Sequence, residues 1–200
     1  RVHVDGARFA NAVASLLHAR GERIDDRAAA TRAARALTVD AGVDALSFGG
    51  TKNGLALGEA VVFFQLPSHA GGKDEGEGVS FPWLRKRSGH LLSKHRFVAA
   101  PFARTLETGA WLASAAHANA MARALAEGLL ALNVPIPFAV DANGVFAQVS
   151  PAVERALVDA GFGFYMFGDP AWRVARFMCS FDTTRDDVDA LLSAFAKALA

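Results

Sequence analysis

Residues 47–54 read Ser-Phe-Gly-Gly-Thr-Lys-Asn-Gly and place a lysine, Lys52, in a glycine-rich turn. Apolar stretches at 43–48 and 60–65 predict strands on both sides of this turn. The second stretch is continuously apolar, which is typical of a strand buried on both faces. Because glycines let the backbone approach a ligand closely, the lysine is either a nucleophilic amine in a site or a solvated residue of a surface turn. The turn alone favours the surface residue.

The elements before this turn predict an α/β fold. Residues 1–5 alternate polar and apolar and predict a strand that ends at Asp5. Residues 7–20 predict a helix, and Asp25 or Asp26 is expected to cap a second helix that reaches about Val39. Helices that alternate with strands predict part of a mostly parallel sheet. The N-terminus reads as the inside of a strand, so the chain is expected to begin in the middle of a fold.

The remainder of the chain changes character twice. Residues 67–82 are glycine-rich and charged and predict an exposed, mobile loop, and 84–132 predict a long helical region with breaks near Gly89 and Pro101. Beyond them the pattern predicts a small α+β domain, with strands at 137–140, 144–149, 162–167 and 173–180 and helices at 151–160 and 185–199. We therefore expect two domains, 1–133 and 134–200.

Composition excludes several classes of protein. The formal net charge is +1, from 21 basic and 20 acidic residues, which argues against a nucleic-acid or anionic-membrane surface. No apolar run approaches the roughly 20 residues that span a bilayer. The single cysteine, Cys179, excludes an internal disulfide framework and fits a reducing compartment, so we expect a cytoplasmic protein.

Three charged or polar groups lie where chemistry is possible. Asp5 ends a predicted strand, where its carboxylate either faces a cationic ligand or caps the following helix. The hydroxyls of Ser47 and Thr51, with the amides of the turn, are suited to hold phosphate. Arg176 interrupts an apolar strand, so its partner is either a substrate carboxylate or an internal acid.

Four segments in this order resemble the threonine aldolase branch of the β-eliminating lyases. They are Asp-Gly-Ala-Arg at 5–8, the turn at 47–54, Gly-Glu-Ala-Val-Val-Phe-Phe at 58–64 and Arg-Lys-Arg-Ser-Gly-His-Leu-Leu-Ser-Lys at 85–94. These are pyridoxal-phosphate (PLP) enzymes of fold type I, the aspartate-aminotransferase fold. The resemblance implies the C-terminal portion of that fold: the end of a mostly parallel large-domain sheet, followed by a small α+β domain.

The resemblance also implies roles for individual residues. Lys52 holds the cofactor covalently, Asp5 pairs with the pyridine nitrogen and keeps it protonated, and Arg8 lies beside the cofactor ring and substrate. Ser47 and Thr51 contribute to cofactor binding. Arg176 matches the arginine that binds the α-carboxylate in the family strand Arg-(Phe/Leu)-Val-Thr-His. Here that strand reads Arg-Phe-Met-Cys-Ser, so Cys179 and Ser180 depart from the pattern.

The implied reaction is retro-aldol cleavage of a β-hydroxy-α-amino acid, such as threonine or allo-threonine, to glycine and an aldehyde. Another PLP-dependent lyase or aminotransferase, or a catalytically silent half-fold that binds partners, are the alternatives. The family implies a homodimer or homotetramer. It also implies an N-terminal segment that supplies the phosphate-binding turn and the histidine that stacks on the ring.

None of the histidines in this chain fits that stacking role, and two of them, His90 and His95, are expected at the surface or in a subunit contact. The six are His3, His18, His69, His90, His95 and His117.

Overall fold

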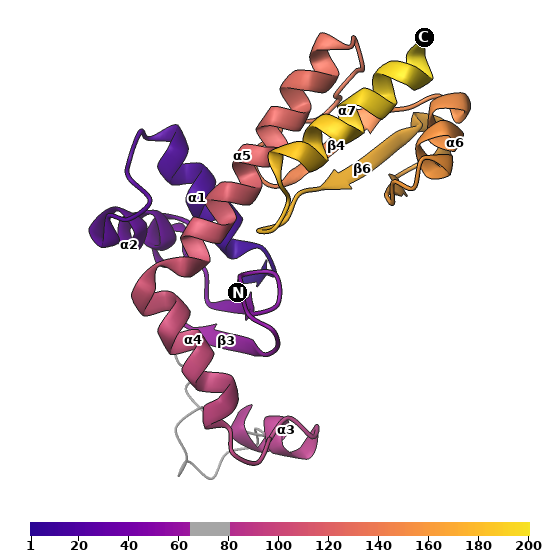
Figure 1. Cartoon of the computed structure of the whole chain (residues 1–200). Coiled ribbons are helices and arrows are strands. Elements are labelled where there is room, and N and C mark those ends of the chain that lie inside the picture. The colour runs from indigo at the N-terminus through magenta and orange to yellow at the C-terminus, as the bar shows by residue number, and fades with distance from the viewer. Residues whose placement is uncertain (65–80) are drawn as a thin grey trace.

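The structure, a computed structural model, describes residues 1–64 and 81–200 (Figure 1). It contains two three-stranded sheets, one near each end of the chain, with strand orders β1-β2-β3 and β4-β6-β5. The long helix α5 (Ala110–Ala131) runs from the first sheet's helices to the second sheet. Within the described residues, no helix is both long and apolar enough to cross a membrane.

The first sheet carries the segments that flank the lysine turn. β1 (His3–Gly6) pairs in parallel with β2 (Ala45–Gly49), and Asp5 lies opposite Ser47 in this register. β3 (Glu59–Phe63) pairs antiparallel with β2. Helices α1 (Phe9–Ala19) and α2 (Arg27–Ala36) connect β1 to β2 and cover one face of the sheet. Their shared core consists of Phe9, Val13, Leu17, Ala29, Ala33, Leu46, Phe48 and Leu112.

The expectation that the strand at 60–65 is buried on both faces is wrong for the described residues. β3 lies at the edge of its sheet, and Val61 and Val62 are 42% and 39% exposed. The sheet contains one parallel and one antiparallel pair, so within the described chain it is mixed rather than mostly parallel. An apolar run indicates that a strand avoids water, but it does not identify the segment that covers it.

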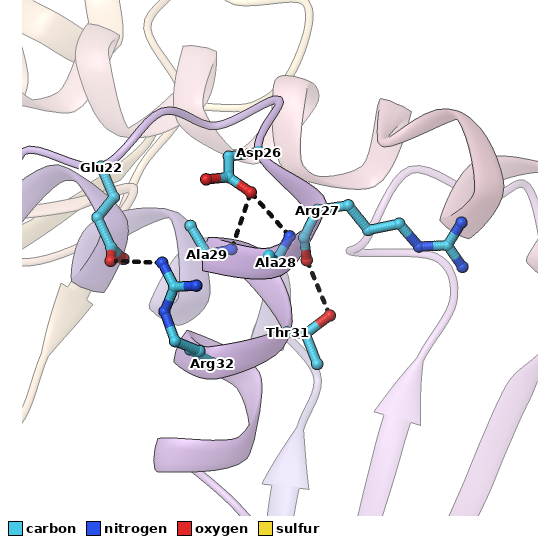
Figure 2. Close-up of polar contacts among 7 residues, drawn as sticks. All are labelled: Glu22, Asp26, Arg27, Ala28, Ala29, Thr31 and Arg32. Atoms are coloured by element: carbon cyan, nitrogen blue, oxygen red, sulfur yellow. Dashed lines mark hydrogen bonds and ion pairs between the residues drawn. The ribbon is translucent and has the colours of Figure 1, made fainter.

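Helix α2 begins at a side-chain cap, as the sequence predicted, and Asp26 is the capping residue (Figure 2). The Asp26 Oδ1 atom accepts hydrogen bonds from the amides of Ala28 (2.8 Å) and Ala29 (3.1 Å). Asp25 instead forms an exposed ion pair with Arg23. The helix ends at Ala36, and a separate 3₁₀ turn, η1 (Val39–Ala41), follows the capping residues. This local motif gives α2 a fixed start, although most of its surface is solvated.

The predicted helical region is three helices: α3 (Phe81–Arg87), α4 (Arg96–Thr108) and α5. Gly89 and Gly109 interrupt them with left-handed φ angles of 80° and 74°, conformations that glycine adopts without strain. The expected break at Pro101 is wrong, because this proline lies inside α4. The expected loop at 67–82 falls outside the described residues, except for Phe81 and Pro82, which begin α3.

The second sheet is antiparallel, with β6 (Val174–Met178) between β4 (Gly144–Gln148) and β5 (Tyr165–Phe167). Helix α6 (Pro151–Asp159), the 3₁₀ turn η2 (Pro170–Trp172) and helix α7 (Arg185–Leu199) complete this part. Ser150 caps α6, as predicted, and Thr184 forms a capping box with Asp187 at α7. These caps are local, which makes them readable from sequence.

The strand predicted at 137–140 is wrong, because these residues form no ladder. Pro137 has no amide hydrogen to donate, and Phe138 instead packs edge-to-face on Phe146 with ring centroids 5.7 Å apart.

The division into two domains near residue 133 stays a prediction. Helix α5 contributes Leu112 to the core beneath β2 and Leu125 and Leu129 to the core beneath the second sheet.

Replacing Asp26 by Ala is expected to lower the free energy of unfolding by about 1 kcal/mol, because two amides of α2 lose their acceptor. Asp25→Ala is the matched control and is expected to cost about 0–1 kcal/mol, since its ion pair is solvated. Urea unfolding of the two variants beside the parent measures both values. Equal losses would contradict the capping role.

Candidate active site

Lys52 lies in a tight turn at the carboxyl end of β2. The Gly50 carbonyl accepts hydrogen bonds from the amides of Asn53 and Leu55, each at 3.0 Å, which closes the turn. Gly50 has no room for a side chain, because an added Cβ would lie 2.9 Å from Phe102 Cζ and closer still to the Gly58 carbonyl. The Lys52 side chain is exposed. The glycines therefore hold the backbone close to its surroundings while the lysine stays accessible.

Lys52 and Arg8 line one cavity of about 190 Å³. Thr51 lines it beside them, and Met178, Cys179 and Ser180 border it from the end of β6. The remaining lining residues are Asn11, Asn53, Gly54, Trp111, Ser114, Ala115, Ala118, Asn143 and Phe181. No carboxylate is among them, so the cavity carries two cationic side chains and polar amides and hydroxyls. Such a site favours an anionic ligand.

Asp5 and Ser47 are neighbours on the open face of the first sheet but do not line this cavity. The Asp5 Oδ1 atom accepts a hydrogen bond from the Ala7 amide at 3.0 Å. The alternative role of Asp5 as the N-cap of α1 is wrong. The N-cap residue of α1 is Arg8, and its side chain forms no capping hydrogen bond. The Ser47 hydroxyl lies 2.8 Å from His3 Nε2. Asp5, Ser47 and His3 thus form a polar group on one sheet face.

Arg8 and Arg176 are near enough for their charges to interact, and neither forms a salt bridge within the described residues. The pKa of Arg8 is lowered, first because the group is partly buried and second because Arg176 adds a like charge. The Nε atom of Arg176 is buried and has no hydrogen-bond partner within residues 1–64 and 81–200. Its guanidinium instead lies over the Tyr165 ring, 6.0 Å from the centroid. Two unneutralised guanidinium groups make this the natural position for a carboxylate or phosphate.

The two residues that depart from the family strand differ in their surroundings. Cys179 is buried, and burial raises the pKa of its thiol to about 11, so the thiol is uncharged at neutral pH. The Cys179 carbonyl accepts a hydrogen bond from Asn143 Nδ2 at 2.6 Å. Ser180 is exposed, and its hydroxyl bonds to Asp182. The Cys179 thiol is therefore not an activated nucleophile, although both residues border the cavity.

The structure brings together part of the predicted set. Arg8, Thr51 and Lys52 share the cavity, Arg176 lies near Arg8, and Asp5 and Ser47 lie on the adjoining sheet face. His90 and His95 are exposed, whereas His69 lies outside the described residues. Within residues 1–64 and 81–200, no cluster of three or more metal-ligating side chains occurs.

Asn53 was not among the site residues predicted from the sequence. Asn53, next to Lys52, is almost completely buried, with 2% of its side chain exposed. An asparagine between lysine and glycine looks like an ordinary turn residue. Three of its four partners lie more than 40 residues earlier in the chain, and only they reveal a different role.

A larger groove of about 800 Å³ lies on the face of the first sheet opposite to the one that carries Asp5 and Ser47. It is bounded by α2, the sheet and the start of α5. Its lining is mostly apolar and includes Phe9, Phe48 and Trp111. It contains no lysine, histidine or cysteine, so the candidate chemistry lies in the smaller cavity.

The sequence model of the family described as "Beta-eliminating lyase" matches residues 1–152. The chain belongs to the beta-eliminating lyase family. The expected family resemblance is therefore confirmed, and the match covers the cavity residues of the first sheet, with Arg8, Thr51 and Lys52 among them.

Two curated relatives are low specificity L-threonine aldolases. The protein from Pseudomonas sp. (strain NCIMB 10558) is 42% identical over 185 residues, and that from Pseudomonas aeruginosa is 45% identical over 186. Each alignment covers 91% of this chain and 46% of the relative. The chain therefore spans about half the length of the curated relatives it matches.

A solved structure titled as the threonine aldolase of Leishmania major has a similar fold. The two structures superpose with a TM-score of 0.75 at 21% sequence identity, over 99% of this chain and 52% of that one. At this identity the likeness establishes the fold alone. It supports the α/β class.

An anion is expected to stabilise the protein through Arg8 and Arg176. Glycine at tenfold its dissociation constant should raise the free energy of unfolding by about 1.4 kcal/mol, and Arg176→Gln should remove most of this gain. Arg185→Gln is the matched control, because Arg185 is exposed and pairs with Asp189 at 2.9 Å. Thermal unfolding with and without glycine gives the values. Equal stabilisation of both variants would contradict the anion site.

Proposed function

We propose that this chain forms part of a PLP-dependent enzyme that cleaves a β-hydroxy-α-amino acid, of the threonine or allo-threonine type, to glycine and an aldehyde. The observation that carries the proposal is the shared cavity. Lys52 and Arg8 both line this cavity, and the charge of Arg176 acts on Arg8. The family match and the two threonine aldolase relatives support the choice of lyase chemistry.

The residues of the cavity fit the cofactor. PLP carries an anionic phosphate, and the cavity offers cations, the Thr51 hydroxyl and no lining carboxylate. The buried, unpartnered Nε of Arg176 indicates a further anion, which the α-carboxylate of an amino acid supplies. Gly50, which has no space for a Cβ, lets the turn that carries Lys52 pack closely against Gly58 and Phe102.

Each residue then has a specific task. When bound, the cofactor supplies an electron sink for the carbon–carbon bond that breaks. Lys52 would attach the cofactor through its nucleophilic amine. Thr51 would bind the phosphate from within the cavity. From the adjoining sheet face, Ser47 would add a hydroxyl to the phosphate site and Asp5 would hold the proton on the pyridine nitrogen. Arg8 and Arg176 bind the substrate carboxylate and thereby fix the orientation of the bond to be cleaved.

Other sequence of the same fold is needed to complete this site. The open face of the first sheet carries Asp5, Ser47 and Val61, and the outer edges of β1 and β3 have no neighbouring strand within the described residues. Edges of this kind are normally paired or covered. We propose that an N-terminal segment of the complete protein covers them and supplies the ring-stacking residue. We also propose a cytoplasmic homodimer or homotetramer.

Lys52→Ala is the test of the proposed function. The variant is expected to lose covalent cofactor attachment and to reduce cleavage of threonine by orders of magnitude, because an alanine offers no amine for imine exchange. Visible absorbance after addition of PLP and an aldehyde assay with the threonine isomers measure both. Near-normal absorbance and turnover in this variant would rule out the assignment. Lys197→Ala, on the exposed end of α7, is the control.

Asp5→Asn is expected to keep cofactor binding but to slow cleavage strongly, because an unprotonated pyridine is a poor electron sink. The amide retains an oxygen acceptor for the Ala7 amide, so the fold should change little. Cofactor titration and kcat for threonine cleavage separate the two effects. An unchanged kcat would assign Asp5 to the turn alone.

A further inference from the structure

Asn53 makes a set of contacts that its position in a turn does not require. Asn53 is 2% exposed, and within the described residues its side chain forms hydrogen bonds only to backbone groups, three of them on the segment from Gly6 to Ala10 and one at Gly49. A buried amide is costly unless its oxygen and both hydrogens are satisfied, and here they are. The asparagine is therefore committed to holding backbone together rather than to contacting solvent.

These contacts join two segments that are distant in sequence. Asn53 Oδ1 accepts a hydrogen bond from the Ala10 amide at 2.8 Å. Asn53 Nδ2 donates to the carbonyls of Gly6 (3.2 Å) and Ala7 (3.3 Å), and also to the Gly49 carbonyl. One side chain thus bonds to the end of β1, the start of α1 and the end of β2.

The bond to Ala10 replaces a missing helix cap. Ala10 lies in the first turn of α1, where amides have no partner within the helix. The cap residue, Arg8, has a φ of −130° and makes no side-chain bond to these amides. Asn53 supplies the acceptor from 43 residues away. The position of α1 is consequently coupled to the position of the lysine turn.

The same bonds fix the backbone on both sides of the candidate chemistry. Lys52 immediately precedes Asn53, and the bonded residues Gly6, Ala7 and Ala10 enclose Arg8 and follow Asp5. The long side chain of Lys52 is exposed and has no hydrogen-bond partner within the described residues. Its amine can be placed reproducibly only if its Cα is held.

We propose that Asn53 is a positioning residue, which holds Lys52 in register with Asp5 and Arg8. This inference rests on the proposed function of Lys52. It assigns to Asn53 no contact with substrate or cofactor reactive atoms. Its effect passes through the backbone of the turn, and misplacement of a reacting group by about 1 Å costs on the order of 100-fold in rate.

A second buried asparagine provides the matched control. Asn119, on α5, is 1% exposed, and its Nδ2 donates to the Asn11 carbonyl at 3.0 Å. Its Oδ1 accepts from Asn11 Nδ2 at 2.9 Å. This pair joins α1 to α5, so its loss should also destabilise the fold. None of its partners adjoins Lys52 in the sequence.

The experiment compares the variants Asn53→Ser, Asn53→Ala, Asn119→Ser and Asn119→Ala in the holoenzyme. Melting temperature reports the structural cost, and the growth of visible absorbance after PLP addition gives the rate of cofactor attachment. Cleavage of threonine gives kcat and KM. For Asn53→Ala, attachment rate and kcat are expected to fall roughly 10–100-fold per folded molecule, with a smaller change in KM. Asn53→Ser, which keeps one hydroxyl, should lie between this variant and the parent.

The Asn119 variants should melt at a lower temperature than the parent protein. Their rate of cofactor attachment and their kcat should stay within about twofold of the parent values. If all four variants instead lose rate in proportion to melting temperature, Asn53 is purely structural and the inference is wrong. The inference would also be wrong if both Asn53 variants attached the cofactor and cleaved threonine at the rates of the parent protein. The proposed function would stand in that case. If the complete protein without any substitution attaches no cofactor, both the inference and the proposed function are wrong. If Asn53→Ala does not fold, the two Ser variants decide.

Discussion

The hydrogen bonds of the Asn53 amide connect the parts of this fold on which the candidate site depends. They hold the turn after β2 against the junction of β1 and α1, so that Lys52 and Arg8 open into the same cavity. Parallel pairing of β1 with β2 sets the coarse alignment, with Asp5 opposite Ser47. The amide adds the finer constraint, because it satisfies an otherwise uncapped helix and three carbonyls at once.

Helix α5 supplies the second constraint, since it packs against both sheets. Its first half joins the core beneath β2, and its second half joins the core beneath β4 and β6 (Figure 1). This arrangement brings the end of β6 to the cavity and Arg176 close to Arg8. Both arginines are partly buried, and the charge of Arg176 helps to lower the pKa of Arg8, so a bound anion would offset the repulsion between them. The electrostatics therefore favour a ligand with a carboxylate or phosphate.

The features that could be predicted from sequence are those set by near neighbours in the chain. The caps at Asp26 and Ser150 depend on amides two or three residues away, and the alternation of strand and helix over residues 1–49 depends on local periodicity. The edge position of β3 and the absence of a strand at 137–140 depend on which segments meet in space. The same holds for Asn53 and for the closeness of Arg8 to Arg176. Motif resemblance located Lys52, but it carried no information about what holds that lysine in place.

The claim that Lys52 attaches the cofactor is tested most directly by borohydride reduction of the PLP-loaded protein, followed by mass mapping of its peptides. Reduction converts an imine into a stable secondary amine and so records which lysine held the cofactor. The account predicts the pyridoxyl label on the peptide that contains Lys52, in the Gly-Gly-Thr-Lys-Asn-Gly turn. A label on any lysine other than Lys52, or no label on any lysine, would contradict it.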